Sequence, residues 1–415
     1  MTSIIPATSK GRLSPSGQGV SLVSIFAVLT PARKLGLRMF AVLGLLALAA
    51  CDGVPSSNLG GPSINPTTPV PVALLVPRGS GQSGDDVLAQ SLENAARLAI
   101  SDLQGVEIDL RVYNTAGNAD IAASQATQAV ADGAKIILGP VYGESANAAG
   151  LAVANKGVNV LSFSNNASIA GGNVFVLGPT FQNTANRLAQ FAAGQGKSRI
   201  VVVHSQDVAG EQGKAAIENA VRRSGASVVA SVPYQLSQQG VVAAVPEIRA
   251  AVGSSGADAM FTTATTASAL PLLTQLLPES GVDPAQTQFI GLTRWDIPSQ
   301  TLELPGVQNG WFALPDPGRS AAFQSRYQVA YGAAPHPIGG LAYDGIAAIG
   351  ALVGSGNSNA LTGGALTQSA GFQGVNGIFR LLPDGTNERG MAVATIRDRQ
   401  VVVIDSAPGS FGAGF

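Results

Sequence analysis

The stretch KIILGPVYGESANAAGLAVANKGVNVLSFSNN, residues 135–166, contains the pattern that decides the fold. It predicts a short apolar strand over 135–138, a helix rich in small residues over 145–155 and a second apolar strand over 158–163. Short β-rich runs that alternate with helices are typical of βαβ units, whose right-handed crossovers join parallel strands. The stretch therefore predicts a parallel sheet flanked by helices.

The same alternation continues on both sides of this stretch and divides into two series. The first begins near Val70 and the second begins with a helix over 184–194. Each series covers about 110 residues, an ordinary size for one domain, so we expect two α/β lobes. The remaining chain predicts helices over 321–331 and 341–353, then a meander of three β-rich runs, 377–380, 391–396 and 400–404, with a hairpin turn at 383–385.

Composition excludes several classes of partner and site. Of the 415 residues 46% are hydrophobic, which is ample for a large core, while 12% are charged and the net charge is −1. This balance provides no broad field to hold nucleic acid. The single cysteine, Cys51, excludes an internal disulfide, and two distant histidines make a metal site improbable. We expect no metal and no cofactor.

A basic and apolar segment precedes Cys51. Arg33, Lys34 and Arg38 come before an uncharged apolar run over 39–50, whose last residues are small. A positive region, a short apolar run and small residues at a cleavage site are the parts of an export signal. The alternatives are a buried helix or a membrane span, but a span needs about 20 apolar residues.

Leu48-Ala49-Ala50-Cys51 resembles the lipobox of bacterial lipoproteins. The resemblance implies that the leader, residues 1–50, is removed and that Cys51 is acylated, which anchors the protein in a membrane. We therefore expect a location in the cell envelope, on the periplasmic side of the inner or outer membrane. Residues 51–69, rich in Pro, Gly, Ser and Asn, predict a flexible tether.

Five segments carry a further pattern: 136–140, 158–162, 201–211, 342–345 and 374–385. In these segments and their order, the chain over 70–405 resembles the type I periplasmic binding proteins, especially the leucine/isoleucine/valine-binding branch. The resemblance implies a two-lobed fold in which the chain crosses between the lobes three times. We expect lobe one to contain 70–181 plus 311–365 and lobe two 182–310 plus 366–405, followed by a tail, 406–415. Hinges are expected near 177–182, 310–317 and 366–377.

The loops that follow the strands form the candidate binding site, because ligands bind beyond the carboxyl ends of parallel strands. The helix start at 143–145 favours an anionic group, and the resemblance implies that an amino-acid carboxylate is held there. Helix capping by Glu144 or Ser145, and plain turn chemistry at 164–166, remain alternatives. The candidate residues are Tyr142, Gly143, Glu144, Ser145, Ser164, Asn165, Asn166, Asp207, Thr262, Arg294 and Asp296.

Two positions depart from the leucine-binding pattern. The aromatic residue that closes over the ligand in that family aligns with Ala209. The acid that pairs with a ligand's ammonium group aligns near Thr293 and Arg294, and an arginine cannot pair with an ammonium. Asp296 could compensate, although Trp295 and Asp296 could equally be packing and capping residues. Segments 291–296 and 310–313 also resemble the penicillin-binding protein activators, a lipoprotein subgroup of the same fold that acts on peptidoglycan synthases.

These patterns predict a binding protein rather than an enzyme. The sequence contains no nucleophile elbow, phosphate-binding loop or zinc-protease motif, and we expect no catalytic residue. We expect a small polar ligand of the amino-acid or amide class, held between two lobes and delivered to an ABC permease. The alternative is regulation of a peptidoglycan synthase through the same fold.

Overall fold

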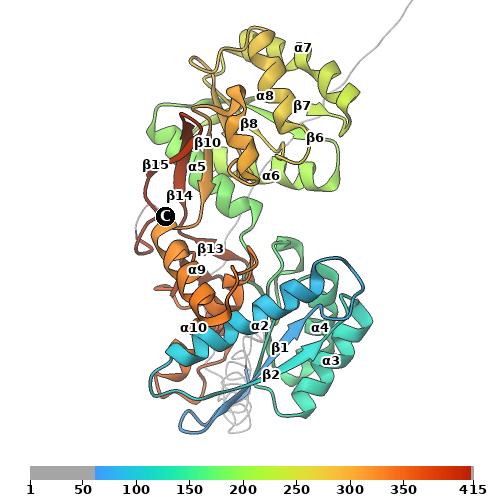
Figure 1. The fold of residues 1–415 in the computed structure, drawn as a ribbon, viewed down its shortest axis with the longest axis vertical. Helices are drawn as coiled ribbons and strands as arrows, with labels where there is room; N and C mark the ends of the chain where they lie inside the picture. The colour runs from blue at the N-terminus through green and yellow to red at the C-terminus, as the bar shows by residue number, and fades with distance from the viewer. Residues whose placement is uncertain (1–60, 413–415) are drawn as a thin grey trace, which may run out of the picture. The chain divides into compact units, whose positions relative to one another are not determined.

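Two helix-flanked sheets dominate residues 61–412, the part of the chain that the computed structural model describes (Figure 1). The predicted leader, Cys51 and residues 52–60 lie outside the described residues. The first sheet contains β1 (Val70–Val76), β2 (Ile108–Asn114), β3 (Ile136–Leu138), β4 (Asn159–Ser162) and β5 (Val174–Val176). Its helices are α2 (Asp85–Asp102), α3 (Ala119–Ala131), α4 (Gly143–Val153) and α10 (Gly340–Val353).

The first sheet is a buried layer with helices on both faces. Its strands run in the order β2-β1-β3-β4-β5 and all pair in parallel. Val72 and Leu74 pack with α2 and α10, whereas Ala73 and Leu75 pack with α3 and α4. Successive side chains of a strand point to opposite faces, so the continuous apolar run of β1 fills both cores.

The second sheet has a similar parallel part and an added antiparallel pair. Strands β6 to β10 are parallel, and β14 and β15 extend the sheet beyond β10 in antiparallel fashion. Helices α5 and α6 cover one face, and α7 and α8 cover the other. The elements are β6 (Arg199–Ser205), β7 (Ser227–Tyr234), β8 (Ala259–Thr262), β9 (Gln288–Gly291), β10 (Trp311–Leu314), β14 (Ala392–Arg397), β15 (Gln400–Asp405), α5 (Phe181–Gly194), α6 (Val208–Arg223), α7 (Gln238–Ser255) and α8 (Leu270–Glu279).

A third, small antiparallel sheet contains β11 (Phe372–Gly374), β12 (Gly377–Leu381) and β13 (Asn387–Arg389). The predicted meander is wrong, because 377–380 pairs with β11 and β13 rather than with β14. The predicted turn at 383–385 does join a hairpin, β12 to β13. Phe372 and Phe379 pack in the core of the first sheet, so the range 366–405 is shared between the lobes instead of belonging to lobe two.

Within residues 61–412, three segments connect the two lobes: β5 to α5, β10 to α9 (Pro317–Tyr331) and β13 to β14. The first two lie within the expected ranges, but the third lies at Gly390 and Met391 and not at 366–377. The expected boundary at residue 311 also differs, because β10 pairs with β9 in the second sheet. The Asn387 Nδ2, in β13, donates to the carbonyl oxygens of Val176 and Gly178, at 2.7 and 2.9 Å, which joins the third sheet to the start of the first connection.

The segments at both ends of the described chain pack against the fold. Ile64 is buried in the core of the first sheet, and its N–H donates to the Ser358 carbonyl at 2.9 Å. The last part of the expected tether, 61–69, is therefore attached to lobe one, because a buried isoleucine anchors it. In the expected tail, the ring of Phe411 lies 4.5 Å from the Arg380 guanidinium. The remaining short helices are α11 (Gly363–Leu366), η1 (Ala154–Lys156), η2 (Ala167–Ile169), η3 (Ser299–Glu303) and η4 (Pro305–Val307).

Candidate ligand-binding site

Each large sheet has a point at which its strand order reverses. In the first sheet this point lies between β1 and β3, because α2 and α4 leave these strands on opposite faces. In the second sheet it lies between β6 and β8, where α6 and α8 do the same. Loops that diverge in this way leave a crevice in which ligands of open α/β sheets bind. The candidate residues 142–145, Asp207 and Thr262 all lie at one of these two points.

Tyr142 reaches across the reversal point of the first sheet. Its hydroxyl donates a 2.5 Å hydrogen bond to Oδ1 of Asp85, the first residue of α2. This hydrogen bond, together with burial, raises the pKa of Tyr142 to about 12, so the phenol stays protonated at neutral pH. A Cβ built on Gly117 would lie 3.2 Å from Tyr142 Cε2 and 3.3 Å from the Cβ of Ser80. Tyr142 therefore brings together the loops that follow β1, β2 and β3.

Asp85 is a site residue that the sequence did not single out. An acidic residue in the first turn of a helix is ordinary, because it complements the positive end of the helix dipole. The structure shows that Asp85 is 6% exposed and that its Oδ2 has no hydrogen-bond partner within the described residues. The available signal was its position directly after the Gly- and Ser-rich loop of β1.

The start of α4 adjoins the loop that follows β4. A Cβ built on Gly143 would lie 3.3 Å from Asn166 Nδ2 and 3.5 Å from Ser164 Oγ. The structure shows no side-chain cap at this helix start, so capping by Glu144 or Ser145 is not observed. Uncapped N–H groups in a first helical turn favour an anionic group. The helix start at 143–145 therefore still suits the anionic group expected from the sequence.

The loop over 164–166 is largely occupied with its own turn. Ser164 Oγ accepts a 3.1 Å hydrogen bond from the Asn166 N–H, and Asn166 Oδ1 accepts one of 2.9 Å from the Ser168 N–H. These contacts correspond to the turn alternative left open by the sequence. Asn165 is exposed, whereas Ser164 is buried. Donors toward a ligand would come from the Asn166 amide beside Gly143 and from Asn165.

The reversal point of the second sheet brings Asp207 and Thr262 to the same edge. Asp207 caps α6 and accepts hydrogen bonds from Ser205 Oγ at 2.6 Å and from the Gly210 N–H at 2.9 Å. Both donors lower the pKa of Asp207, so its carboxylate is charged at neutral pH. Thr262 is buried, and its Oγ1 accepts from the Ala264 N–H at 3.1 Å. The two loops are joined because the Ser205 N–H donates to Thr263 Oγ1 at 3.2 Å.

Arg294 and Asp296 form an ion pair with each other. Arg294 Nε donates to Asp296 Oδ1 at 2.9 Å, and a second contact joins Nη2 to Oδ2. The Asp296 carboxylate is therefore matched by a cation of its own loop. Trp295 is fully buried between Gly291 and Gly310, where an added Cβ would come within 2.1 and 2.0 Å of the indole. Trp295 is a packing residue, one of the two alternatives that the sequence left open.

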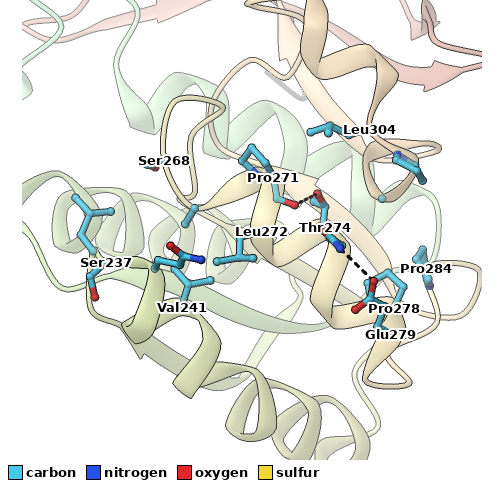
Figure 2. Close-up of a pocket in the computed structure, with 16 residues that line it drawn as sticks. Ser237, Val241, Ser268, Pro271, Leu272, Thr274, Pro278, Glu279, Pro284 and Leu304 are labelled. Atoms are coloured by element: carbon cyan, nitrogen blue, oxygen red, sulfur yellow. Dashed lines mark hydrogen bonds between the residues drawn. The ribbon is translucent and has the colours of Figure 1, made fainter.

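Two large cavities of the structure lie away from these loops. One of about 940 Å³ runs along α7 and α8 and is lined by apolar side chains such as Val241, Leu272 and Leu304 (Figure 2). Another of about 910 Å³ lies along α5 and the end of β15, beside Arg187 and Asp405. Neither is lined by a candidate residue. The candidate site consists of two sets of loops, one in each lobe.

The described residues were also compared with what a metal site or a membrane-spanning helix requires. Across 61–412 no three or more His, Cys, Asp or Glu side chains gather as metal ligands would. Of the helices in this part of the chain, none is both long and apolar enough to cross a bilayer. His204 is buried, with its Nδ1 3.3 Å from Glu211 Oε1.

Comparison with known proteins agrees with this architecture. The family described as periplasmic binding protein matches residues 69–400. No curated protein matches the sequence.

Several solved structures share the fold at low sequence identity. A branched-chain amino acid ABC transporter periplasmic ligand-binding protein from Burkholderia xenovorans LB400 is 18% identical, with a TM-score of 0.65 over 82% of this chain and 96% of that one. An ABC transporter substrate-binding protein from Sphaerobacter thermophilus is 18% identical, with a TM-score of 0.63 over 84% and 100%. One from Desulfitobacterium hafniense, in complex with Leu, is 19% identical, with a TM-score of 0.60 over 81% and 100%.

At these identities the structures show the fold alone, and they confirm the expected two-lobed architecture of parallel sheets flanked by helices. The family match covers most of the chain. This protein belongs to the periplasmic binding protein family.

Proposed function

We propose that this protein binds a small polar ligand, of the amino-acid or amide class, in the cell envelope and delivers it to an ABC transporter. The observation that carries the proposal is the placement of polar loops at the reversal point of both sheets, in two lobes joined by three connections. Family membership supports it. So do relatives that are ABC transporter binding proteins, one of them in complex with Leu.

The mechanism is a shift between open and closed arrangements of the lobes. A ligand that contacts the loops of both lobes stabilises the closed form by its higher affinity for that form. The start of α4 would hold an anionic group, and the loops of Asp207 and Thr262 would cover the ligand from lobe two. This function requires no covalent chemistry.

A thermal-shift screen tests the binding function. The full chain, purified in detergent, is heated with each of the common L-amino acids and with small amides. A ligand at a hundred times its dissociation constant adds about 2.7 kcal/mol of stability, a clear rise in Tm. If none of these compounds raises Tm, the proposed ligand class is wrong.

We also propose that acylated Cys51 anchors the protein on the periplasmic side of a membrane. The support is the order of basic residues, apolar run and small residues that precede Cys51. Metabolic labelling with an alkyne fatty acid should mark the wild type and not Cys51→Ser. Equal labelling of both proteins would refute acylation at this residue.

Action on a peptidoglycan synthase remains the second candidate, on sequence resemblance. The segment that suggested it, 291–296 with 310–313, forms a packing unit around Trp295. Co-purification with a peptidoglycan synthase, together with no thermal response to any small ligand, would favour this alternative over transport.

A further inference from the structure

We infer that Asp85 receives the ammonium group of an α-amino acid, so that lobe one holds both charged groups of the ligand. This inference rests on the proposed binding function and specifies its ligand class. It assigns the ammonium subsite to lobe one, whereas the leucine-binding pattern has an acid near Thr293 and Arg294 of lobe two.

The position of Asp85 is the first observation. It lies where α2 begins, at the reversal point between β1 and β3, which is the place at which ligands of such sheets bind. It is 6% exposed, and its Oδ2 has no hydrogen-bond partner among the described residues. An unsatisfied buried acceptor costs about 1–3 kcal/mol, and more if it is charged, so its retention requires an explanation.

The second observation is the arrangement of Asp85 and the start of α4 around one side chain. Tyr142 immediately precedes the first residue of α4, and its hydroxyl donates to Asp85 Oδ1 at 2.5 Å. The carboxylate of Asp85 and the uncapped N–H groups of 143–145 thus lie within reach of a single tyrosine. An α-amino acid carries its ammonium and its carboxylate on one carbon, and it needs an acceptor and an anion site this close together.

Two neighbouring charged groups, Arg78 and Asp86, have partners of their own. Arg78 pairs with Glu93 at 3.1 Å, and Asp86 accepts a 3.0 Å hydrogen bond from the Gly79 N–H. In lobe two, Asp296 is paired with Arg294. Among the described carboxylates at this reversal point, Asp85 is the buried one, and its Oδ2 has no hydrogen-bond partner, whereas Asp86 and Glu144 are exposed to solvent.

The ammonium donates to Asp85 Oδ2, which has no partner here, and also takes over the hydrogen bond that Tyr142 donates to Oδ1. A neutral phenol is then replaced by a cationic donor, and charge-assisted hydrogen bonds are about twice as strong as neutral ones. Tyr142 turns outward, toward the loops that the closed lobes enclose. Removing the phenol hydroxyl therefore removes a competitor of the ligand.

Isothermal titration of the full chain tests the inference. The probes are the common L-amino acids and, for the one that binds most tightly, the carboxylic acid that lacks its amino group. The wild type should bind the amino acid more tightly than the deaminated acid. Asp85→Asn should lower the affinity for the amino acid by about a hundredfold and leave the affinity for the deaminated acid nearly unchanged. Tyr142→Phe should bind the amino acid at least as tightly, and Asp86→Asn is the matched control for a neighbouring charge.

The outcomes separate the inference from the proposed function. If amino acids bind and Asp85→Asn retains the preference for them, Asp85 is a structural residue and the inference is overturned. If only amides or acids without an ammonium bind, the binding function stands and the inference falls. If nothing binds, both fall. Equal weakening of both probes by Asp85→Asn, with altered circular dichroism, would show a folding role and also overturn the inference.

Discussion

Asp344 and Arg389 form a buried ion pair where the third sheet meets α10. Asp344 Oδ2 lies 3.3 Å from Arg389 Nη1, and Asp344 Oδ1 accepts a 2.7 Å hydrogen bond from the Val375 N–H. Arg389 Nε also donates to the Leu177 carbonyl at 3.0 Å, in the first connection between the lobes. Burial raises the pKa of Asp344 and lowers that of Arg389, so each charge depends on its partner.

We predict that Asp344→Ala destabilises the protein by about 3–5 kcal/mol, because it leaves a buried arginine without its counter-ion. Urea unfolding measures this loss. The double variant Asp344→Leu with Arg389→Met should be less destabilised than the sum of its two single variants, since it removes both charges. A cost below about 1 kcal/mol for Asp344→Ala would contradict this account of the pair.

Asp102 connects α2 to α9 and α10, and its contribution to the stability of the fold depends on pH. Burial raises its pKa, but hydrogen bonds from Arg326 and Tyr343 outweigh burial and hold the pKa below 3.8. A depressed pKa stabilises the fold at pH values above 3.8, and this contribution is lost as the pH falls through the lower, folded-state pKa. The stability difference between wild type and Asp102→Asn, from unfolding curves, should therefore narrow below pH 3.8 and be constant above pH 5. A stability difference that stays constant below pH 3.8 would contradict a lowered pKa of Asp102.

At the scale of elements, the sequence predicts the helices and most strands because each has a clear period and a clear end. It misses β5, β10, β11 and β13, which have only three or four residues and therefore too little pattern to be distinguished from loops. Trp311–Leu314 was assigned to a hinge for this reason. The pairing of β12 was also wrong, since a short apolar run does not specify its partner strand.

The sequence identifies the loops of the candidate site but not their internal contacts. Position after a strand is enough to select 142–145, Asp207 and Thr262, since all strands of a parallel sheet end at one edge. The hydrogen bond between Tyr142 and Asp85 joins two residues that are 57 positions apart. It depends on the direction of the Tyr142 side chain, which the sequence does not specify. The pairing of Arg294 with Asp296 likewise depends on loop geometry.

Gly310 allows the indole of Trp295 to pack against the second sheet. A Cβ at Gly310 would stand 2.0 Å from Trp295 Cζ3. We predict that Gly310→Ala destabilises the protein by about 1–3 kcal/mol through overpacking. The control is Gly253→Ala in α7, where no atom lies within 4 Å of the added Cβ and the helix should gain about 0.5–1 kcal/mol. Equal effects of the two substitutions in urea unfolding would contradict this.

At the scale of the whole molecule, the account depends on movement about three connections. Asn387 and Arg389 bind the first connection, at 176–178, to the third sheet, so these residues move with lobe one. We therefore expect bending at the residues beyond them, near 179–180, 315–316 and 390–391. The loops at the two reversal points would then approach each other around the ligand.

The distance between the two lobes, measured by pulsed electron spin resonance, tests this central claim most directly. Spin labels at Ala167→Cys, in the exposed turn after β4, and Val208→Cys, at the exposed start of α6, report this distance in a Cys51→Ser background. The account predicts that the amino acid with the largest thermal shift shortens this distance and narrows its distribution. If that amino acid binds and the distance distribution is unchanged, ligand-driven closure of the two lobes is wrong.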